Sequence, residues 1–136
     1  MKILLVRHAE TEGSEKGIFL GSIDESLNEK GRKQAEKLAE RLKKEKIDVI
    51  FSSKLKRAKE TAEIINRYHG LPIKFDKLLK ERDFGIFQGR PKEEFFRALK
   101  ESGKQFHEFV PEGGESCQSV QRRAVKFFNK ILKKIF

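Results

Sequence analysis

The apolar positions of this chain fall in short runs that are separated by helical stripes. Ile3 to Val6 is a run of apolar residues short enough for one buried strand, and it stops abruptly at Arg7-His8. Val49 to Phe51 predicts a second buried strand, which Ser52-Ser53 closes. Pro72 to Phe75 predicts a third strand at an edge of the sheet, because proline is tolerated at edges.

Between these runs, apolar residues recur three and four positions apart, which predicts amphipathic helices. Asn28 is a suitable N-cap for a helix to about Lys46, and a second helix follows Ser53 and ends at Gly70. Residues 117–136 have the pattern of a helix with one basic face. The apolar stripes are Ala35, Leu38, Ala39 and Leu42, then Ala58, Thr61, Ala62 and Ile65, then Val120, Ala124, Phe127, Phe128, Ile131 and Ile135. Alternating strands and helices predict an α/β fold, with three αβα layers and a mainly parallel sheet.

Charge narrows the class of partner. The 31 Lys and Arg residues against 21 Asp and Glu give a net charge of +10, which favours phosphorylated small molecules, nucleic acid or an anionic surface. Most of these cations are interspersed with Glu, a pattern of solvated helix faces that weighs against a nucleic-acid groove. The same interpretation applies to the cations of the last helix, Arg122, Arg123, Lys126, Lys130, Lys133 and Lys134, although nucleic-acid binding there stays open.

The sequence lacks a membrane-spanning run and a disulfide pair, and both features bear on the cellular location of the protein. No apolar run approaches the ~20 residues that span a bilayer, and the start of the chain lacks a secretion signal. The single cysteine, Cys117, cannot form an internal disulfide, so we expect a cytoplasmic protein without membrane attachment. Abundant Lys and Glu without Trp also resemble the composition of heat-adapted proteins.

The polar residues after the first two strands are the candidate chemistry. Ligands bind at the carboxyl ends of parallel strands, where His8 could be a nucleophile and Arg7 could grip an anion. An ordinary strand followed by a polar loop is the alternative. Arg57 falls in the first turn of the next helix, where free N–H groups and the helix dipole already favour an anion. Its alternative is a surface side chain.

Arg7-His8-Ala9-Glu10-Thr11 resembles the signature of the histidine phosphatase superfamily, which includes the phosphoglycerate mutases. Four further blocks follow in the family's order and extend the match from residue 2 to about 125. They comprise Gly21, Asp24, Leu27, Gly31-Arg32 and Gln34-Ala35; Ser53, Leu55, Arg57-Ala58 and Thr61-Ala62; Leu79, Glu81, Asp83, Phe84, Gly85, Gln88 and Gly89; and Pro111, Gly113, Gly114, Glu115 and Ser116. The resemblance implies a single phosphoglycerate mutase-like domain over residues 1–136, with residues of about 86–111 as a lid or specificity segment.

The resemblance implies a two-step phosphoryl transfer that requires no metal or cofactor. His8 would accept the phosphoryl group, Arg7 and Arg57 would neutralise its oxygens, and water would then release phosphate. Glu81 would be the general acid and then the general base, with a solvated carboxylate beside Lys80 and Arg82 as the alternative. Ser14 stands where many relatives have a phosphate-binding asparagine, and Gly21 and His107 are candidate substrate contacts.

The apolar residues of the specificity segment have two possible roles. Its apolar residues could line a pocket for an apolar leaving group, or they could be the packing face of a lid helix that begins at Pro91. They are Phe95, Phe96, Leu99, Phe106 and Phe109. Ile18 cannot contact a substrate carboxylate as mutases do, and the long mutase insertion is absent. Both points favour a small phosphatase acting on a phosphorylated metabolite over a mutase.

The family's second catalytic histidine follows the helix after the Glu-Ser turn, in a His-Gly dipeptide that closes a strand beside the first one. This sequence ends at Ile135-Phe136 in or just after that helix, so we expect a shortened chain. His69 and His107 are the remaining histidines, and a helix-end role and a surface role explain them better. We expect residues 3–6 to have an unpaired edge that a second copy or a helical tail covers. A phosphomonoesterase with reduced activity and a non-catalytic phosphate-binding module both stay open.

Overall fold

Two short parallel strands form the sheet of this structure, a computed structural model that describes residues 1–135. β1 (Ile50–Ser52) and β2 (Ile73–Phe75) pair in parallel, with Ile50 opposite Ile73. α3 (Lys56–Asn66) connects them, which is the crossover that neighbouring parallel strands require. Both strands lie where the apolar pattern predicts them, and the α/β class with a parallel sheet is confirmed.

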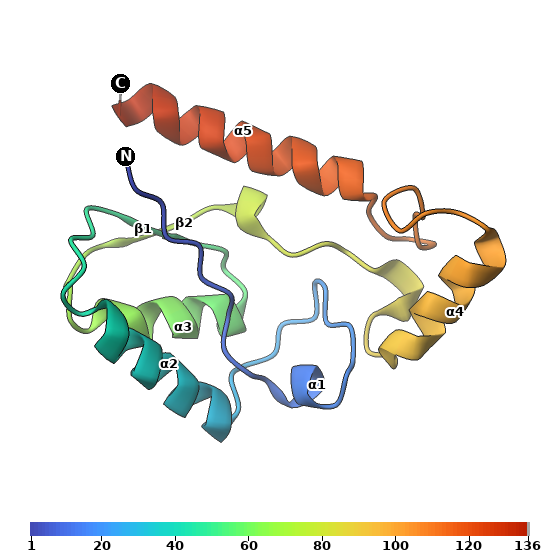
Figure 1. The fold of residues 1–136 in the computed structure, drawn as a ribbon, viewed down its shortest axis with the longest axis horizontal. Coiled ribbons are helices and arrows are strands. Elements are labelled where there is room, and N and C mark those ends of the chain that lie inside the picture. The colour runs from blue at the N-terminus through green and yellow to red at the C-terminus, as the bar shows by residue number, and fades with distance from the viewer. Residues whose placement is uncertain (136) are drawn as a thin grey trace.

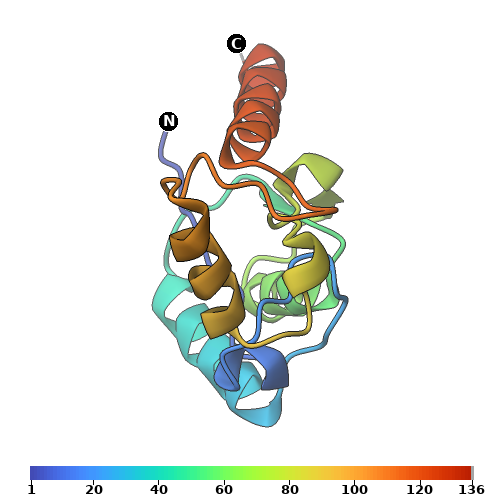
Figure 2. The same cartoon turned by 90° about the vertical axis from the view of Figure 1, so that its right-hand side faces the viewer.

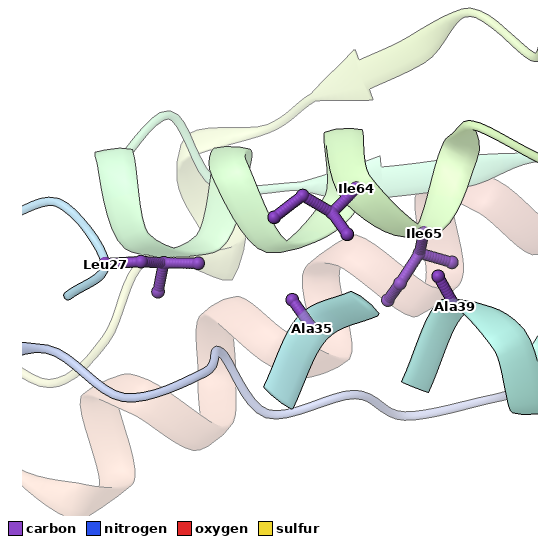
Figure 3. Close-up of a cluster of buried hydrophobic side chains, with 5 residues drawn as sticks. All are labelled: Leu27, Ala35, Ala39, Ile64 and Ile65. Carbon is purple, nitrogen blue, oxygen red and sulfur yellow. The ribbon is translucent and has the colours of Figure 1, made fainter. Parts of the chain in front are cut away.

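α2 (Glu29–Leu42) packs against α3, and the two helices build the first hydrophobic core. The Asn28 side chain accepts a hydrogen bond from the Gly31 N–H at 2.7 Å, which confirms the predicted N-cap. The helix ends at Leu42, four residues before the predicted end. Figure 3 shows the buried core residues of this layer, Leu27, Ala35, Ala39, Ile64 and Ile65.

A second core consists almost entirely of phenylalanine. It is built by η2 (Gly85–Phe87), a 3-10 turn, and α4 (Lys92–Ser102), at the end of the molecule that faces the viewer in Figure 2. Phe95 is fully buried, and its ring lies edge-on to Phe19, Phe84 and Phe87, with centroids 5.2, 5.6 and 5.5 Å away. Packing therefore explains Phe95, while Phe96 and Phe106 stay about half exposed.

α5 (Cys117–Ile135) lies across β1 and η1 (Lys77–Leu79), as Figure 1 shows. The Phe127 ring meets Phe51 of β1 edge-on at 5.2 Å, and Lys130 pairs with Asp76 at 2.6 Å. The predicted amphipathic helix is confirmed, but the apolar end expected at Ile135-Phe136 lies outside the described side chains. No helix within residues 1–135 is both long and apolar enough to cross a membrane.

The N-terminal segment corrects one expectation. Residues 3–6 belong to no strand, and Leu5 is 85% exposed, so the predicted buried first strand is wrong. Apolar character makes a segment suitable for a sheet, but a strand also needs a neighbour to accept and donate its ladder hydrogen bonds. Within residues 1–135, β1 pairs only with β2, and no strand pairs with residues 3–6. The segment is therefore an extended, unpaired approach to His8 (Figure 1).

Candidate active site

Arg57 lies at the centre of the site and is 1% exposed. It belongs to the first turn of α3, and its guanidinium points into the loop that precedes α2. Nη1 donates to the Ile23 carbonyl at 2.7 Å, and Nη2 donates to the Gly21 carbonyl at 2.6 Å and to Glu81 Oε2 at 2.9 Å. A buried guanidinium needs such partners, because burying it unpaired would cost several kcal/mol. The surface alternative for Arg57 is therefore excluded.

His8 is half-buried at the end of the N-terminal segment. Its Nδ1 lies 2.7 Å from the Ala9 carbonyl oxygen. Since a carbonyl can only accept, Nδ1 carries the proton in this contact, and in the neutral ring Nε2 carries the lone pair. The adjacent Ala9 N–H donates to Thr61 Oγ1 at 3.1 Å, and the Thr61 hydroxyl donates to the Arg57 carbonyl at 2.7 Å. Thr61 thereby ties the histidine to the helix that carries Arg57.

Burial and three charged residues influence the pKa of His8. Burial is the main cause that lowers the pKa of His8 below the ordinary histidine value, and the positive charges of Arg57 and Arg7 lower it further. The hydrogen bond to Ala9 and the negative charge of Glu81 act in the opposite direction and raise this pKa. The net result is an imidazole that stays neutral, and therefore nucleophilic, at near-neutral pH.

Glu81 reaches the site from the segment that follows η1. Its carboxylate accepts the bond from Arg57 on one side, and the side chain is otherwise 41% exposed. The ion pair with Arg57 distinguishes this carboxylate from one that is surrounded only by solvent. The Glu81 carboxylate is thus open to solvent while a buried cation orients it.

The structure gives Ser14 and Gly21 roles within the protein. Ser14 lies in α1 (Glu12–Glu15), where its hydroxyl accepts from the Thr11 N–H at 2.9 Å and donates to the Thr11 carbonyl at 3.0 Å. Gly21 has φ +54°, which L side chains rarely adopt, and a Cβ there would lie 3.0 Å from the Arg82 carbonyl oxygen, so the position favours glycine. Ser14 caps α1, and Gly21 belongs to the loop that holds Arg57. Their direct contact with phosphate or substrate stays a prediction.

His107 has a different local environment from the half-buried His8. It is exposed in the turn between α4 and α5, and its role as a substrate contact also stays a prediction. Across residues 1–135, no three side chains of His, Cys, Asp or Glu gather closely enough to hold a metal ion. The candidate site consists of the His8 imidazole, the buried Arg57 guanidinium and the Glu81 carboxylate, with the exposed Arg7 next to His8 in the sequence.

Two contacts near the site do not follow from the sequence pattern. The pattern places Thr61 only on the inner face of its helix, although its position one turn after Arg57 brings its hydroxyl to the Arg57 carbonyl. The pattern also predicts a solvated Arg123, and this is wrong, because its guanidinium donates to the Glu81 carbonyl at 3.1 Å. The available signal was spacing, since Arg123 lies four residues before the buried Phe127 and shares its helix face.

The order of these residues and their convergence are those of a known family of phosphoryl-transfer proteins. The family model of the histidine phosphatase superfamily (branch 1) matches residues 3–135. The chain therefore belongs to this superfamily, and the resemblance seen in the sequence is confirmed.

Individual relatives are phosphatases by name. The chain is 38% identical over 139 residues to phosphoserine phosphatase 1 of Hydrogenobacter thermophilus, with 98% of this chain and 65% of the relative covered. It is 36% identical over 138 residues to the fructose-2,6-bisphosphatase TIGAR of Bos taurus, with 98% and 51% covered. Among solved structures, a mycobacterial glucosyl-3-phosphoglycerate phosphatase matches with a TM-score of 0.86 and 29% identity, covering 94% of this chain and 63% of that one.

The structural match confirms the phosphoglycerate mutase-like α/β fold over nearly all of the chain. An alpha-ribazole-5'-phosphate phosphatase from Escherichia coli, described as putative in its structure, also matches with a TM-score of 0.84. The chain spans between about half and two thirds of the length of these relatives. Their activities are therefore properties of longer proteins.

Proposed function

We propose that this chain is a phosphomonoesterase that acts on a small phosphorylated metabolite through a phosphohistidine intermediate at His8. The proposal rests above all on the state of His8, whose Nδ1 is held by the Ala9 carbonyl so that Nε2 is available. The positive charges of Arg7 and Arg57 would stabilise the phosphoryl oxygens, and the Glu81 carboxyl group would exchange protons with the leaving group and water. The names of several relatives support the same reaction class.

The reaction would proceed in two displacements. Nε2 of His8 forms a bond to phosphorus while the ester P–O bond breaks, and Glu81 gives a proton to the departing alkoxide. Glu81 then takes a proton from water, whose oxygen bonds to phosphorus while the bond to His8 breaks. Arg7 and Arg57 hold the negative oxygens in both steps. In this account Ser14, Gly21 and His107 are candidate contacts to the bound substrate, and residues of about 86–111 form the specificity segment of a single domain.

A non-catalytic phosphate-binding module is the second candidate. One observation favours it, namely that the residues leading to His8 are exposed and unpaired, with Leu5 85% exposed. A nucleophile on such a segment is held less firmly than one at the end of a paired strand. Phosphate binding would rest in this case on the positive charges of Arg7 and Arg57, which remain when turnover is lost.

Leaving-group chemistry separates the two candidates and tests Glu81. We expect the wild-type chain to hydrolyse both p-nitrophenyl phosphate and O-phosphoserine. In Glu81→Gln, O-phosphoserine hydrolysis should fall about 10²–10⁴-fold, since its alkoxide needs a proton to leave. The p-nitrophenyl ester should lose much less in the first displacement, because nitrophenolate leaves without one. Burst and steady-state release of both products measure this difference.

The matched control is Glu36→Gln, which removes an exposed carboxylate from α2 and should leave both rates unchanged. Phosphate affinity of the wild type is measured in parallel by titration calorimetry. Phosphate binding without any turnover of either ester would reject the enzyme and support the binding module.

The acid limb of the pH profile provides a further prediction. His8 must be neutral to attack, and its pKa lies below the ordinary histidine value, chiefly because of burial. The value of kcat/KM should therefore begin to fall only when the pH drops below about 6.5, the ordinary histidine pKa. Protonation of His8 causes this loss. An acid limb centred above the ordinary histidine value would contradict the described environment of His8.

We further propose that the protein is cytoplasmic. We also propose that residues 3–6 pair with the same segment of a second copy of the chain. Unpaired N–H and C=O groups on an apolar, extended segment favour such pairing. Sedimentation velocity should show a dimer that Leu5→Lys converts to monomer, because a charge blocks edge pairing. A wild-type monomer at high concentration would contradict this arrangement.

A further inference from the structure

Arg123 of α5 is directed at the backbone of the segment that carries Glu81. Its Nη1 donates to the carbonyl oxygens of Leu78, at 3.0 Å, and of Lys80. Its Nη2 donates to the carbonyl oxygen of Glu81 at 3.1 Å. One guanidinium therefore binds three carbonyl groups within four consecutive residues that end at the candidate acid.

Glu115 fixes this guanidinium in place. Nε and Nη2 of Arg123 each lie 2.7 Å from one of the two carboxylate oxygens of Glu115, which is the bidentate geometry that is specific to arginine. Both side chains are only 17% exposed. Glu115 also accepts from the Ser119 hydroxyl at 3.0 Å and from the Asp83 N–H at 3.3 Å. The hydrogen bonds from Arg123 are the main cause that lowers the pKa of Glu115 to about 2, so the pair persists in mild acid.

Arg82 anchors the other side of the same segment. It is 7% exposed, and its guanidinium donates to the carbonyl oxygens of Glu115 and Phe109 at 2.9 and 2.7 Å. The Phe84 and Phe106 rings lie under it, with their centroids 5.3 and 5.2 Å from Cζ. The side chains of Arg82 and Arg123 thus restrain the backbone on both sides of the peptide that follows Glu81.

We propose that Arg123, held by Glu115, is a positioning residue for the general acid and base Glu81. This inference rests on the proposed function, because it concerns the acid of that reaction. The Glu81 carboxylate itself contacts Arg57 through one oxygen and is 41% exposed, so its place depends strongly on where its backbone is held. Proton transfer requires the donor within hydrogen-bond distance of the leaving oxygen, and a displacement of about 1 Å is enough to weaken it.

Arg123 also owes its own position to α5. Phe127 and Lys130 follow it at spacings of four and seven residues and contact Phe51 and Asp76, so the three side chains share one docked face of the helix. The docked helix therefore fixes where the Arg123 guanidinium meets the backbone of residues 78–81. Arg122, the preceding residue, is exposed and provides a matched comparison.

Three substitutions on α5 test the inference in the full chain. In Arg123→Met, kcat for O-phosphoserine should fall about 10- to 100-fold, as expected for loss of a supporting residue, with KM nearly unchanged. The initial burst of nitrophenolate should change by less than about threefold, because that leaving group does not need the acid. Arg122→Met removes the same charge from the same helix and should change neither rate. Arg123→Lys should not restore activity, since an ammonium cannot bind the carboxylate and three carbonyls together.

Glu115→Gln provides a second route to the same result if Arg123→Met does not fold, which thermal unfolding establishes. It keeps the shape of the side chain but weakens its hold on Arg123, so the O-phosphoserine rate should fall with the nitrophenolate burst preserved. An equal loss with both esters, or unchanged rates, would overturn the positioning role. A wild-type chain that hydrolyses neither ester would instead overturn the proposed function. In that case Arg123→Met must still increase amide hydrogen exchange at Glu81 and Arg82 relative to Arg122→Met. Unchanged exchange would show that Arg123 does not restrain this backbone.

Discussion

Replacement of His8 by alanine should reduce phosphomonoesterase activity by at least about 10³-fold, because the nucleophile of the first displacement is lost. The half-buried imidazole is replaced by a smaller apolar group beside Ala9, and the buried Arg57 keeps its own three acceptors. Phosphate affinity of His8→Ala should therefore equal or slightly exceed that of the wild type, since the imidazole is removed while Arg7 and Arg57 are kept. Initial rates with p-nitrophenyl phosphate and calorimetric titration with phosphate measure the two effects.

The comparison variant is His107→Ala. His107 is exposed in the turn after α4 and is a candidate substrate contact, so its removal should lower the rate with p-nitrophenyl phosphate far less than the loss of His8 does. A rate that survives in His8→Ala and disappears in His107→Ala would move the nucleophile to the specificity segment. That result would reject the central assignment of His8.

Arg57→Met should affect both activity and stability. The substitution removes a cation that neutralises the transferring phosphoryl group, which costs about 10²–10³-fold in kcat. It also leaves the carbonyls of Gly21 and Ile23 without their donor, and buried unsatisfied acceptors cost about 1–3 kcal/mol each. We therefore expect the free energy of unfolding to fall by about 3 kcal/mol, measured by urea titration with an unchanged slope.

Arg67→Met removes a cation from the other end of α3 and serves as the control. The Arg67 side chain is 63% exposed and lies 3.7 Å from Glu36, so its loss should change stability by less than about 0.5 kcal/mol. Similar losses in both variants would show that Arg57 contributes only its charge to the helix. The backbone contacts described for the site would then have no energetic importance.

Much of the helical part of the fold follows from local patterns. The stripe that contains Ala35 and Ala39 faces α3 as expected, because helical spacing alone decides which residues share a face. The N-cap at Asn28 is likewise local, since its side chain bonds only three residues away. The strand predicted at residues 3–6 fails for the opposite reason. Its apolar pattern is suitable for a sheet, but strand formation depends on a distant partner that the pattern does not contain.

The candidate site shows the same division between local and long-range information. The resemblance named His8, Arg57 and Glu81, and the structure brings Arg57 and Glu81 to 2.9 Å and within the electrostatic influence of His8. Arg123 could not be assigned in this way, because the carbonyl groups that it binds belong to residues more than 40 positions earlier in the chain. On a charged helix, a cation that faces the protein has the same sequence pattern as a cation that faces water.

Direct detection of the phosphorylated residue tests the account most sharply. The chain is mixed with p-nitrophenyl phosphate, quenched in alkali within the first turnover, digested and examined by mass spectrometry. We predict one added phosphoryl group on the peptide that contains His8, on the nitrogen remote from the Ala9 contact, and none in His8→Ala. Turnover with a phosphoryl group on any other residue, or with none on His8 at any time, would contradict the account.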